Sequence, residues 1–444
     1  MAKKKQKEKK RKLVFEVLIF IGLMLVATVV GVVMWQMSGE KESELVKWGL
    51  PNRGLPVMEI NLNGVSLEEI EAGSKEMKYP GNELFLYDDG ARVEYQNVEL
   101  KGRGNTTWLQ EKKPFQIKFD RNVDLLGLGK AKKWVLLAGV VDPTYLRNEV
   151  AFTLAEMIGS QYNHRGEFVE LYIDNSYRGL YYMVQKIDIA KGSVDLRRND
   201  GVLMEMDMLH RGADEKCYET YFDECLVLKD IIMIDDGSEN VIEGFLRDFN
   251  KIEKAVEEGD YETMAEEADI ESFAVYYLIN EFTVNPDAYS TSFYVYRNNE
   301  GKISAGPVWD FDYALANRGW VWQIDERMFD PNEEMVKKRE AFGDDDIEED
   351  KNISRLVYYM MEMPEFRDEV EQVFQERMKG EKDELRRMIV SKVNEIYRAA
   401  KADGEKWERY NFEKEVLKMM RWIDKRYEHF ERTYGSNEVI EGAI

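Results

Sequence analysis

The feature that most constrains this chain is an uncharged apolar stretch near its N-terminus. Residues 17–36 read VLIFIGLMLVATVVGVVMWQ and contain no Asp, Glu, Lys or Arg. A helix of about 20 apolar residues is long enough to cross the hydrocarbon core of a membrane. Residues 1–12 hold eight basic residues and one acid, a bias typical of the cytoplasmic side. We therefore predict a basic cytoplasmic stub at 1–12, one transmembrane helix at 13–37 and a body outside the cell membrane.

A cleaved signal peptide is the alternative interpretation of this stretch. The apolar region of a signal peptide spans about 7 to 15 residues and is followed by a small-x-small cleavage site. The stretch in this chain is longer, and no such site follows it. We therefore expect an uncleaved anchor, followed by a short tether at residues 38–55.

The charge of the chain excludes one class of partner. The whole chain has 62 Lys and Arg against 86 Asp and Glu, a formal charge of −24. Without residues 1–37, which hold 8 of these basic and 2 of these acidic residues, 54 basic and 84 acidic residues remain, a charge of −30. A body this acidic is a poor ligand for phosphate backbones, so we predict no nucleic-acid partner.

Cysteine and histidine are both scarce. Cys217 and Cys225 are eight residues apart, which fits neither a zinc knuckle nor a C-x-x-C redox motif. One disulfide and two free thiols remain equally open, because the sequence does not give their separation in space. Three histidines in the whole chain make a histidine metal cluster or a Ser-His-Asp relay a poor prediction. Chemistry would therefore rest on carboxylates, Lys and Arg.

The first half of the body has the pattern of a β-sheet. Alternating apolar residues and intervening turn signals predict short strands from residue 56 to 138 and a hairpin at 167–184. Strands at 202–206 and 226–228 are expected to extend the same antiparallel sheet. A helix is predicted at 143–158, with Asp142 as its N-cap.

The second half of the body is mostly helical. Apolar residues at helical spacing predict helices starting at Ser238 and at about residue 270, and further helices beyond residue 350. A hairpin at 293–309 interrupts them.

Carboxylates stand at two element ends in this half. Asp287 follows a predicted helix within Asn285-Pro286-Asp287, and Asp310 and Asp312 follow a hairpin strand within Trp309-Asp310-Phe311-Asp312. A kinase scaffold needs one Asp to orient the attacking hydroxyl and, after a hairpin, a second Asp to hold Mg²⁺. Carboxylates that only cap turns are the structural alternative, and an acid and base pair of a glycosidase is a third.

Several blocks of residues, taken in order, resemble the CotH (spore-coat protein H) kinase family of atypical protein kinase-like proteins. They fall within residues 56–320. The blocks are 103–108 (RGNTTW), 113–119 (KPFQIKF), 125–137 (LLGLGKAKKWVLL), 146–148 (LRN), 179–187 (GLYYMVQKI) and 306–312 (GPVWDFD).

The resemblance implies an α+β, atypical protein kinase-like fold that binds ATP and Mg²⁺. Its N-lobe would be an antiparallel sheet and its C-terminal part mostly helical, with a kinase-like body at 56–320 and a helical region at 321–444. Asp287 would be the catalytic base and Asp310 the metal ligand. Asp312 would assist the metal or hydrogen-bond the loop.

A kinase site also needs a cation for the phosphates. Lys118 is the first candidate, followed by Arg103 and Lys186, and the alternative for each is an ordinary surface position. Trp309 would stack on the adenine or belong to the core.

The chain departs from the pattern of kinase-active family members at three positions. Those members carry Lys and Asn where this chain has Thr291 and Ser292, and Glu where it has Gln185. A serine hydroxyl can ligate Mg²⁺ but lacks the stronger carbonyl acceptor of an amide. These changes weaken the case for catalysis without affecting the fold.

Two functions follow from these observations. The first is a membrane-anchored phosphotransferase that acts on protein side chains. The alternative is a catalytically inactive binding or structural protein of the cell surface that keeps the fold, which the scarcity of ATP outside cells favours. The partner would be a protein substrate or a surface protein.

Overall fold

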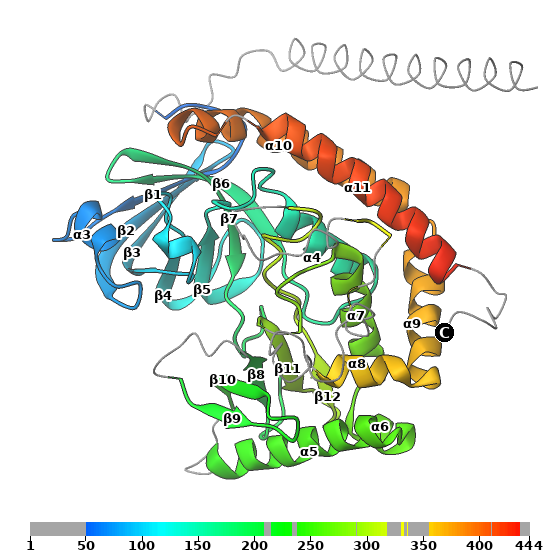
Figure 1. The fold of residues 1–444 in the computed structure, drawn as a ribbon. Coiled ribbons are helices and arrows are strands. Elements are labelled where there is room, and N and C mark those ends of the chain that lie inside the picture. The colour runs from blue at the N-terminus through cyan, green and yellow to red at the C-terminus, as the bar shows by residue number, and fades with distance from the viewer. Residues whose placement is uncertain are drawn as a thin grey trace, which may run out of the picture. The chain divides into compact units, whose positions relative to one another are not determined.

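A computed structural model describes residues 50–207, 215–232, 238–289, 291–317, 330–332, 335, 355–409 and 411–435. The chain divides into two compact units, one of residues 1–52 with 89–91 and one, the body, of residues 53–88 with 92–444. The predicted transmembrane helix and the predicted boundary at residue 320 lie outside the described residues. Among the helices that are described, none has both the length and the apolar character needed to cross a membrane. Strands come first in the body and helices later (Figure 1), which confirms the α+β class.

Seven strands of the body close into a barrel in the order β1-β2-β3-β4-β5-β7-β6. β1 pairs with β6 in parallel and with β2 in antiparallel fashion, so the predicted antiparallel sheet is closed by one parallel pair. The strands are β1 Val57–Asn61, β2 Lys78–Asp88, β3 Ala91–Gly102, β4 Phe115–Asp124, β5 Lys130–Leu137, β6 Gly166–Ile173 and β7 Ser176–Gln185.

Alternation along β4 separates the core of the barrel from its outer face. Phe115 and Ile117 are fully buried in the barrel core. Gln116 and Lys118 lie on the opposite face of the strand, as predicted, because successive side chains of a strand point to opposite sides. Residues 125–129 connect β4 to β5, which begins at Lys130.

A second, five-stranded sheet has the order β12-β11-β8-β10-β9. The prediction that the strands at 202–206 and 226–228 extend the first sheet is therefore wrong. β8 pairs instead with β11 from the hairpin of the second half, and Glu205 lies opposite Tyr294. The strands are β8 Val202–Met206, β9 Cys217–Glu219, β10 Cys225–Ile231, β11 Phe293–Arg297 and β12 Ile303–Ala305.

A disulfide joins Cys217 to Cys225. The two cysteines begin β9 and β10, which pair in antiparallel fashion. Of the two states that the sequence leaves open, the structure shows the bonded one.

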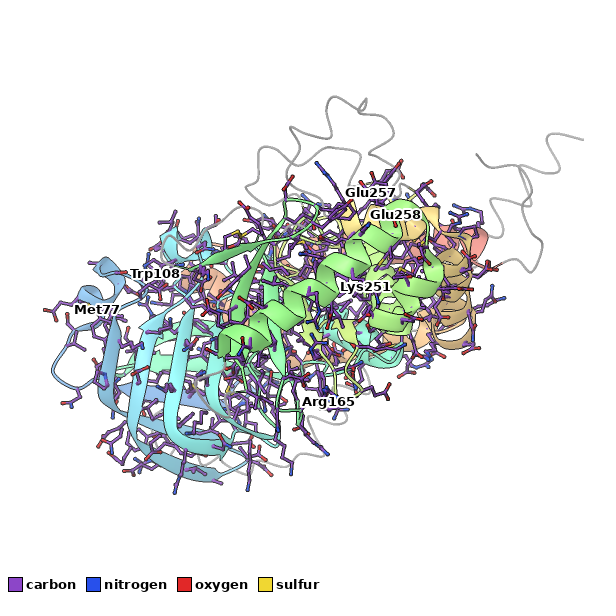
Figure 2. The ribbon with its side chains drawn as sticks, turned by 90° about the horizontal axis from the view of Figure 1, so that it is seen from below. Met77, Trp108, Arg165, Lys251, Glu257 and Glu258 are labelled. Carbon is purple, nitrogen blue, oxygen red and sulfur yellow. A yellow bond between two sulfur atoms is a disulfide. The ribbon has the colours of Figure 1, made fainter. Side chains whose placement is uncertain are left out.

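Helices cover the second sheet and one side of the barrel (Figure 1). α5 carries a fully buried apolar stripe that includes Phe245 and Phe249. Figure 2 shows α5 with Lys251, Glu257 and Glu258, which are exposed. The helices are α3 Leu67–Ala72, α4 Arg147–Met157, α5 Ser238–Glu258, α6 Tyr261–Glu267, α7 Ile270–Thr283, α8 Arg355–Glu362, α9 Pro364–Val373, α10 Lys382–Lys406 and α11 Phe412–Thr433, and short helical turns lie at Thr107–Leu109 and Phe374–Met378.

α4 begins four residues later than predicted, at Arg147. The Asp142 carboxylate accepts hydrogen bonds from the backbone N–H groups of Thr144 at 2.9 Å and Arg147 at 2.9 Å. Tyr145, between them, has a φ of 59° and cannot belong to a helix. Asp142 therefore shapes a turn before the helix instead of capping its first residue.

α10 is attached to the barrel through a buried charge pair. Lys112 and Asp403 are both fully buried, and Lys112 Nζ lies 2.6 Å from Asp403 Oδ1. Tyr145 Oη donates to Asp403 Oδ2 at 2.7 Å, and the backbone N–H of Leu180 on β7 donates to Oδ1 at 2.8 Å. Burial lowers the pKa of Lys112 to about 8, against the opposing effect of Asp403. Every polar atom of the Asp403 carboxylate thus has a partner on the barrel side.

α11 holds the C-terminal end of α7 in the same way. Arg426 and Glu281 are fully buried and form an ion pair at 3.0 Å. Arg426 Nε also donates to the backbone oxygen of Phe282 at 3.2 Å. α7 ends two residues after Glu281, and the loop that carries Asp287 follows. The C-terminal helices therefore fix the position of that loop.

Candidate functional site

The loop that carries Asp287 is shaped by hydrogen bonds within it. α7 ends with Val284 in the left-handed conformation, at a φ of 48°. The side-chain oxygen of the buried Asn285 accepts from the backbone N–H of Asp287 at 3.3 Å. The backbone N–H of Thr291 donates to the backbone oxygen of Asp287 at 3.1 Å. Asp287 is therefore held at the start of a tight turn, half-buried, with a defined orientation of its backbone.

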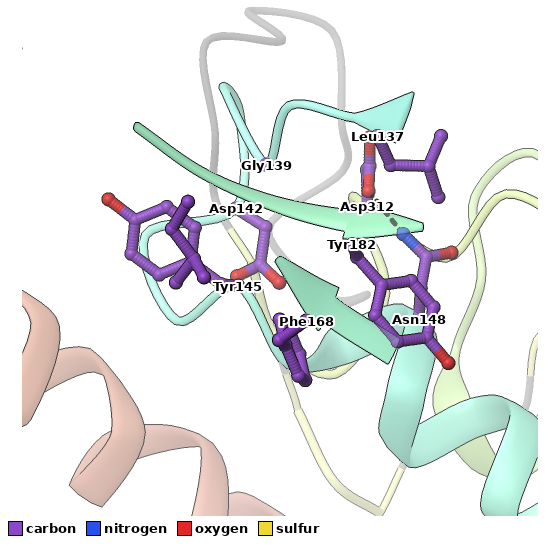
Figure 3. Close-up of a pocket in the computed structure, with 9 residues that line it drawn as sticks. Leu137, Gly139, Asp142, Tyr145, Asn148, Phe168, Tyr182 and Asp312 are labelled. Atoms are coloured by element: carbon purple, nitrogen blue, oxygen red, sulfur yellow. Dashed lines mark hydrogen bonds between the residues drawn. The ribbon is translucent and has the colours of Figure 1, made fainter. Parts of the chain in front are cut away.

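The loop that carries Asp310 and Asp312 is held by Asn148 on α4. Asn148 Nδ2 donates to Asp312 Oδ1 at 2.5 Å, and Asn148 Oδ1 accepts from the backbone N–H of Phe311 at 3.0 Å (Figure 3). Phe311 is fully buried and anchors the loop in the core. Asp310 has a φ of 66°, a conformation that costs free energy for a residue with a side chain. Strained positions of this kind are common at functional sites.

Arg147 fastens the residues just after this loop. It is fully buried, and its Nε donates to the backbone oxygen of Ala314 at 2.9 Å. Its Nη1 also pairs with the carboxylate of Asp142. Arg147 and Asn148 are consecutive residues at the start of α4. The structure shows that they hold the loop with Asp312.

Two direct contacts bring the two loops together. Ser292 Oγ donates to Asp310 Oδ2 at 3.4 Å. The backbone N–H of Leu315 donates to the oxygen of Thr283, the last residue of α7, at 2.7 Å. Asp287 and Asp310 are 23 positions apart in the sequence, and the two loops that carry them thus form one site.

The electrostatics confirm that the carboxylates are close to one another. Burial and, after it, the charges of Asp310, Asp142 and Asp287 together raise the pKa of Asp312 to about 8, while the hydrogen bond from Asn148 opposes them. We call Asp142, Asp287, Asp310 and Asp312 the carboxylate cluster. Like charges this close favour a bound cation, because a cation removes their mutual repulsion.

Arg103 is the cation that faces this cluster. It follows β3 and lies near Tyr294 and Glu205 of the second sheet and near Asp310 and Asp312, all of which raise the pKa of Arg103 against the larger, lowering effect of burial. Its guanidinium stacks over the ring of Trp309, 4.9 Å from the centroid. Its buried Nη1 donates to no group among the described residues.

Lys186 extends the positive charge beyond Arg103. Burial lowers the pKa of Lys186 to about 8, and the neighbouring cations Lys133, Arg103 and Lys101 contribute, against the raising effect of Asp188. Burial and neighbouring cations each lower the pKa of a lysine, because both disfavour its charged form. Arg103 therefore lies near both groups of charges, the carboxylates and the lysines.

A small cavity lies between the carboxylate cluster and the barrel. Its volume is about 10 Å³, room for one water molecule. Asp142, Asn148 and Asp312 line it together with Tyr145 and Tyr182 (Figure 3). The cavity can hold a water molecule beside the carboxylates and is too small for a nucleotide.

Two of the predicted nucleotide contacts lie elsewhere than expected. Lys118 is on β4 opposite Glu99 and Lys133, and it is not among the main electrostatic neighbours of Asp312 or Arg103. Trp309 is 6% exposed, and its ring packs against that of Phe152 with 5.8 Å between the ring centroids. Its other contacts are with His164 and Arg103, so the structure favours the core alternative for Trp309.

No group of three or more His, Cys, Asp or Glu side chains in the described part of the chain is arranged as a metal cage. This is compatible with Mg²⁺ chemistry, because Mg²⁺ is held by one or two carboxylates plus phosphate oxygens. Asp310, Asp312 and Ser292 are the residues here that would hold it. Burial of Arg103 Nη1 without an acceptor indicates that an anion belongs beside it.

Sequence reasoning missed several residues of the site. Asp142 was interpreted as a helix cap, although its charge acts on Asp312. Glu205 and Tyr294 were not considered, because the strand of Glu205 was assigned to the first sheet and its pairing with the strand of Tyr294 was not predicted. His164 was set aside with the other histidines, yet burial and Arg103 lower the pKa of His164 to about 3. Basic residues that alternate along Lys101, Arg103 and Lys133 were the signal that could have revealed the cationic side.

Comparison with known proteins adds one finding. A protein-family model described as "CotH kinase protein" matches residues 100–430. The match includes the carboxylate cluster, Arg103 and Lys186, and it continues through α10 and most of α11. A search of curated proteins finds no match.

Proposed function

The chain belongs to the CotH kinase family, and on that premise we propose that it is a membrane-anchored phosphotransferase that uses ATP and Mg²⁺ to modify protein side chains. Asp287 is the catalytic base and Asp310 a metal ligand. Arg103 and Lys186 bind the phosphates. The anchor is the apolar stretch at residues 17–36, with the N-terminus cytoplasmic and the body outside.

One observation carries this proposal. The buried Nη1 of Arg103 donates to no described residue, while Arg103 lies near the carboxylates of Asp310 and Asp312 and also near Lys186. A buried donor without an acceptor costs about 1 to 3 kcal/mol, more when it is charged. A phosphate group satisfies that donor and is attracted by both cations.

The donor set suits Mg²⁺ and phosphate together. Asp310 and Asp312 supply hard oxygen ligands, and Ser292 supplies a hydroxyl 3.4 Å from Asp310 Oδ2. When bound, Mg²⁺ neutralises charge on the phosphate oxygens. The residues then have distinct tasks: Asp310 and Asp312 hold the metal, Arg103 and Lys186 bind the phosphates, and Asn148 fixes the loop.

Asp287 is placed to act on the acceptor hydroxyl. Its turn is linked to the metal loop through Ser292, but its carboxylate comes from a separate segment. A carboxylate in this place orients the acceptor hydroxyl and accepts its proton. The acceptor would be a side chain of a protein substrate.

The nucleotide assignment predicts a large loss for one variant. Arg103→Ala should lower the affinity of the body, residues 50–444, for ATP with Mg²⁺ by about 10- to 100-fold, because a charged hydrogen bond is lost. Arg103→Lys should restore part of the affinity. Titration calorimetry would measure both. The control is Arg165→Ala, since Arg165 is exposed and pairs with Glu156 alone among the described residues. Equal affinity of Arg103→Ala and the unaltered body would contradict the assignment.

The alternative is a surface protein that keeps the fold without catalysis. Ser292 and Gln185 favour this reading, since they stand where kinase-active members have Asn and Glu. Gln185 Nε2 donates to the backbone oxygen of Leu128 at 2.8 Å, so it has a purely structural contact. A body that binds no nucleotide under any tested condition would support this alternative, with a surface protein as its partner.

The proposed location has its own test. Protease added outside intact cells should cut the body and leave the stub at residues 1–12 protected, because the stub is cytoplasmic in this topology. Antibodies against each end of the chain would detect the fragments. A body that is cut only after the cells are permeabilised would place it in the cytoplasm, where ATP is abundant.

A further inference from the structure

The outer face of α10 and α11 differs from the rest of the acidic body. Residues 382–433 hold 14 Lys and Arg against 11 Asp and Glu, a formal charge of +3. The body beyond residue 37 carries −30. The stretch therefore carries a net positive charge in a body whose total charge is negative.

The exposed cations of α11 form one stripe. Lys414, Arg421 and Lys425 are exposed and seven and four residues apart, so they lie on one side of the helix. Arg398 is exposed on α10. None of the four forms an ion pair with another residue that the structure describes, whereas the acids beside them, Glu413, Glu415 and Asp424, are paired with Lys401, Lys418 and Arg386.

Apolar side chains interrupt this positive surface. Val390 on α10 is 46% exposed, Tyr397 on α10 is 42% exposed and Leu417 on α11 is 47% exposed. These are three of the seven large hydrophobic side chains that are exposed in the described residues. We call the three apolar side chains and the four cations the α10–α11 face.

Contacts between the two helices show that this face is continuous. Tyr397 Oη donates to Glu413 Oε1 at 3.1 Å, and Lys401 Nζ lies 3.2 Å from the same oxygen. Glu413 is one helical turn before Leu417, so Tyr397 and Leu417 lie on neighbouring helices at nearly the same level. Figure 1 shows both helices along one side of the body, away from α5 and the second sheet.

We propose that the α10–α11 face docks on a membrane surface that contains anionic lipids. Unpaired cations around exposed apolar side chains are the pattern of helices that lie in the interface of a membrane. The cations would contact lipid phosphates, and Val390, Tyr397 and Leu417 would enter the headgroup region.

The length of the tether permits this docking. Residues 38–52, between the predicted span and the body, reach at most about 50 Å when extended. The body would thus stay close to the membrane, and weak contacts would suffice because their effective concentration is high. The docking does not depend on phosphotransfer, so it can be tested separately from the proposed activity.

The test uses the body without the anchor. Both hydrophobic cores consist of residues within 55–430, so a protein of residues 50–444 retains all of them. It should sediment with vesicles of phosphatidylcholine mixed with phosphatidylglycerol and not with phosphatidylcholine vesicles. Reversing three cations, in the variant Lys414→Glu, Arg421→Glu and Lys425→Glu, should weaken binding roughly 100-fold. Added salt should weaken the binding of the unaltered body.

A matched control carries the same change in charge on another surface. Arg121, Lys130 and Lys132 are exposed on the barrel, and their replacement by Glu should reduce vesicle binding much less than the α11 variant. Replacing Val390 and Leu417 by Ser should weaken binding roughly tenfold, because apolar contact with the lipid is lost. Circular dichroism would establish that each variant is folded.

Three results would overturn the proposal. The first is no binding of the unaltered body to the anionic vesicles. The second is unchanged binding by the triple variant of α11. The third is binding to soluble polyglutamate that is as tight as binding to vesicles and independent of Val390 and Leu417, which would assign the face to a polyanionic partner.

Discussion

Replacing Asp403 by Asn is expected to lower the free energy of unfolding of the body by about 3 kcal/mol. The change leaves the Lys112 ammonium fully buried without its counter-charge, and removing one partner of a buried pair is far more costly than exchanging both. Asparagine has nearly the shape of aspartate, so lost packing contributes little. Urea unfolding of residues 50–444, followed by circular dichroism, would measure the change.

Two further variants isolate the charge effect. The double variant Lys112→Met with Asp403→Asn removes the unpaired charge and should recover much of the lost stability. Glu413→Gln breaks the half-exposed pair with Lys401 at 3.2 Å and should cost less than about 1 kcal/mol. If Asp403→Asn and Glu413→Gln prove equally stable, the attachment of α10 to the barrel does not depend on this pair.

The order of elements could be predicted because each is marked locally. The hairpin of β6 and β7 surrounds Asp174 and Asn175, both with positive φ, and α7 follows the N-cap Asp269. Turn and cap residues in the sequence do not determine which strands pair with one another. β8 and β10 are short and apolar, and β11, the partner of β8, comes after three intervening helices, α5, α6 and α7, so this sheet could not be deduced from alternation.

The candidate site, like the fold, could be predicted only in part. Asp287, Asp310 and Asp312 were predicted from their positions at element ends, and the structure brings them together. The prediction ranked Lys118 first among the cations because alternation places it on the outer face of β4. Proximity to the carboxylates depends instead on where a strand ends, and Arg103, just beyond β3, lies there. The spacing of residues in the sequence does not give the distance between a cation and the carboxylates.

The C-terminal helices were left without a role by the sequence, and the structure supplies one. α10 contacts the barrel through Asp403, and α11 contacts the end of α7 through Arg426. Both contacts lead to the carboxylate cluster. Tyr145, which follows Asp142 in the sequence, donates a hydrogen bond to Asp403, and Glu281 lies shortly before the Asp287 loop. These helices therefore stabilise the arrangement of the site.

The largest expected effect on activity comes from Asp287. In the body incubated with labelled ATP, Mg²⁺ and a protein acceptor, Asp287→Asn should lower the rate of label transfer by about 1000-fold, because the acceptor hydroxyl loses the group that takes its proton. Its affinity for ATP should change little, since Asp287 binds the acceptor and not the phosphates. Asp310→Asn should instead weaken the binding of ATP in the presence of Mg²⁺, because a metal ligand is lost.

The contrast between these two variants is what tests the assignment. Asp260→Asn is the matched control, since Asp260 caps α6 and lies in a different segment, and its rate should stay within about twofold of the unaltered body. Ser292→Asn supplies the amide found in kinase-active relatives and should raise the Mg²⁺-dependent rate if catalysis is genuine. Equal label transfer by the unaltered body, Asp287→Asn and Asp310→Asn would show that these carboxylates do not perform phosphotransfer, and the site would then be one that binds its ligand without reacting.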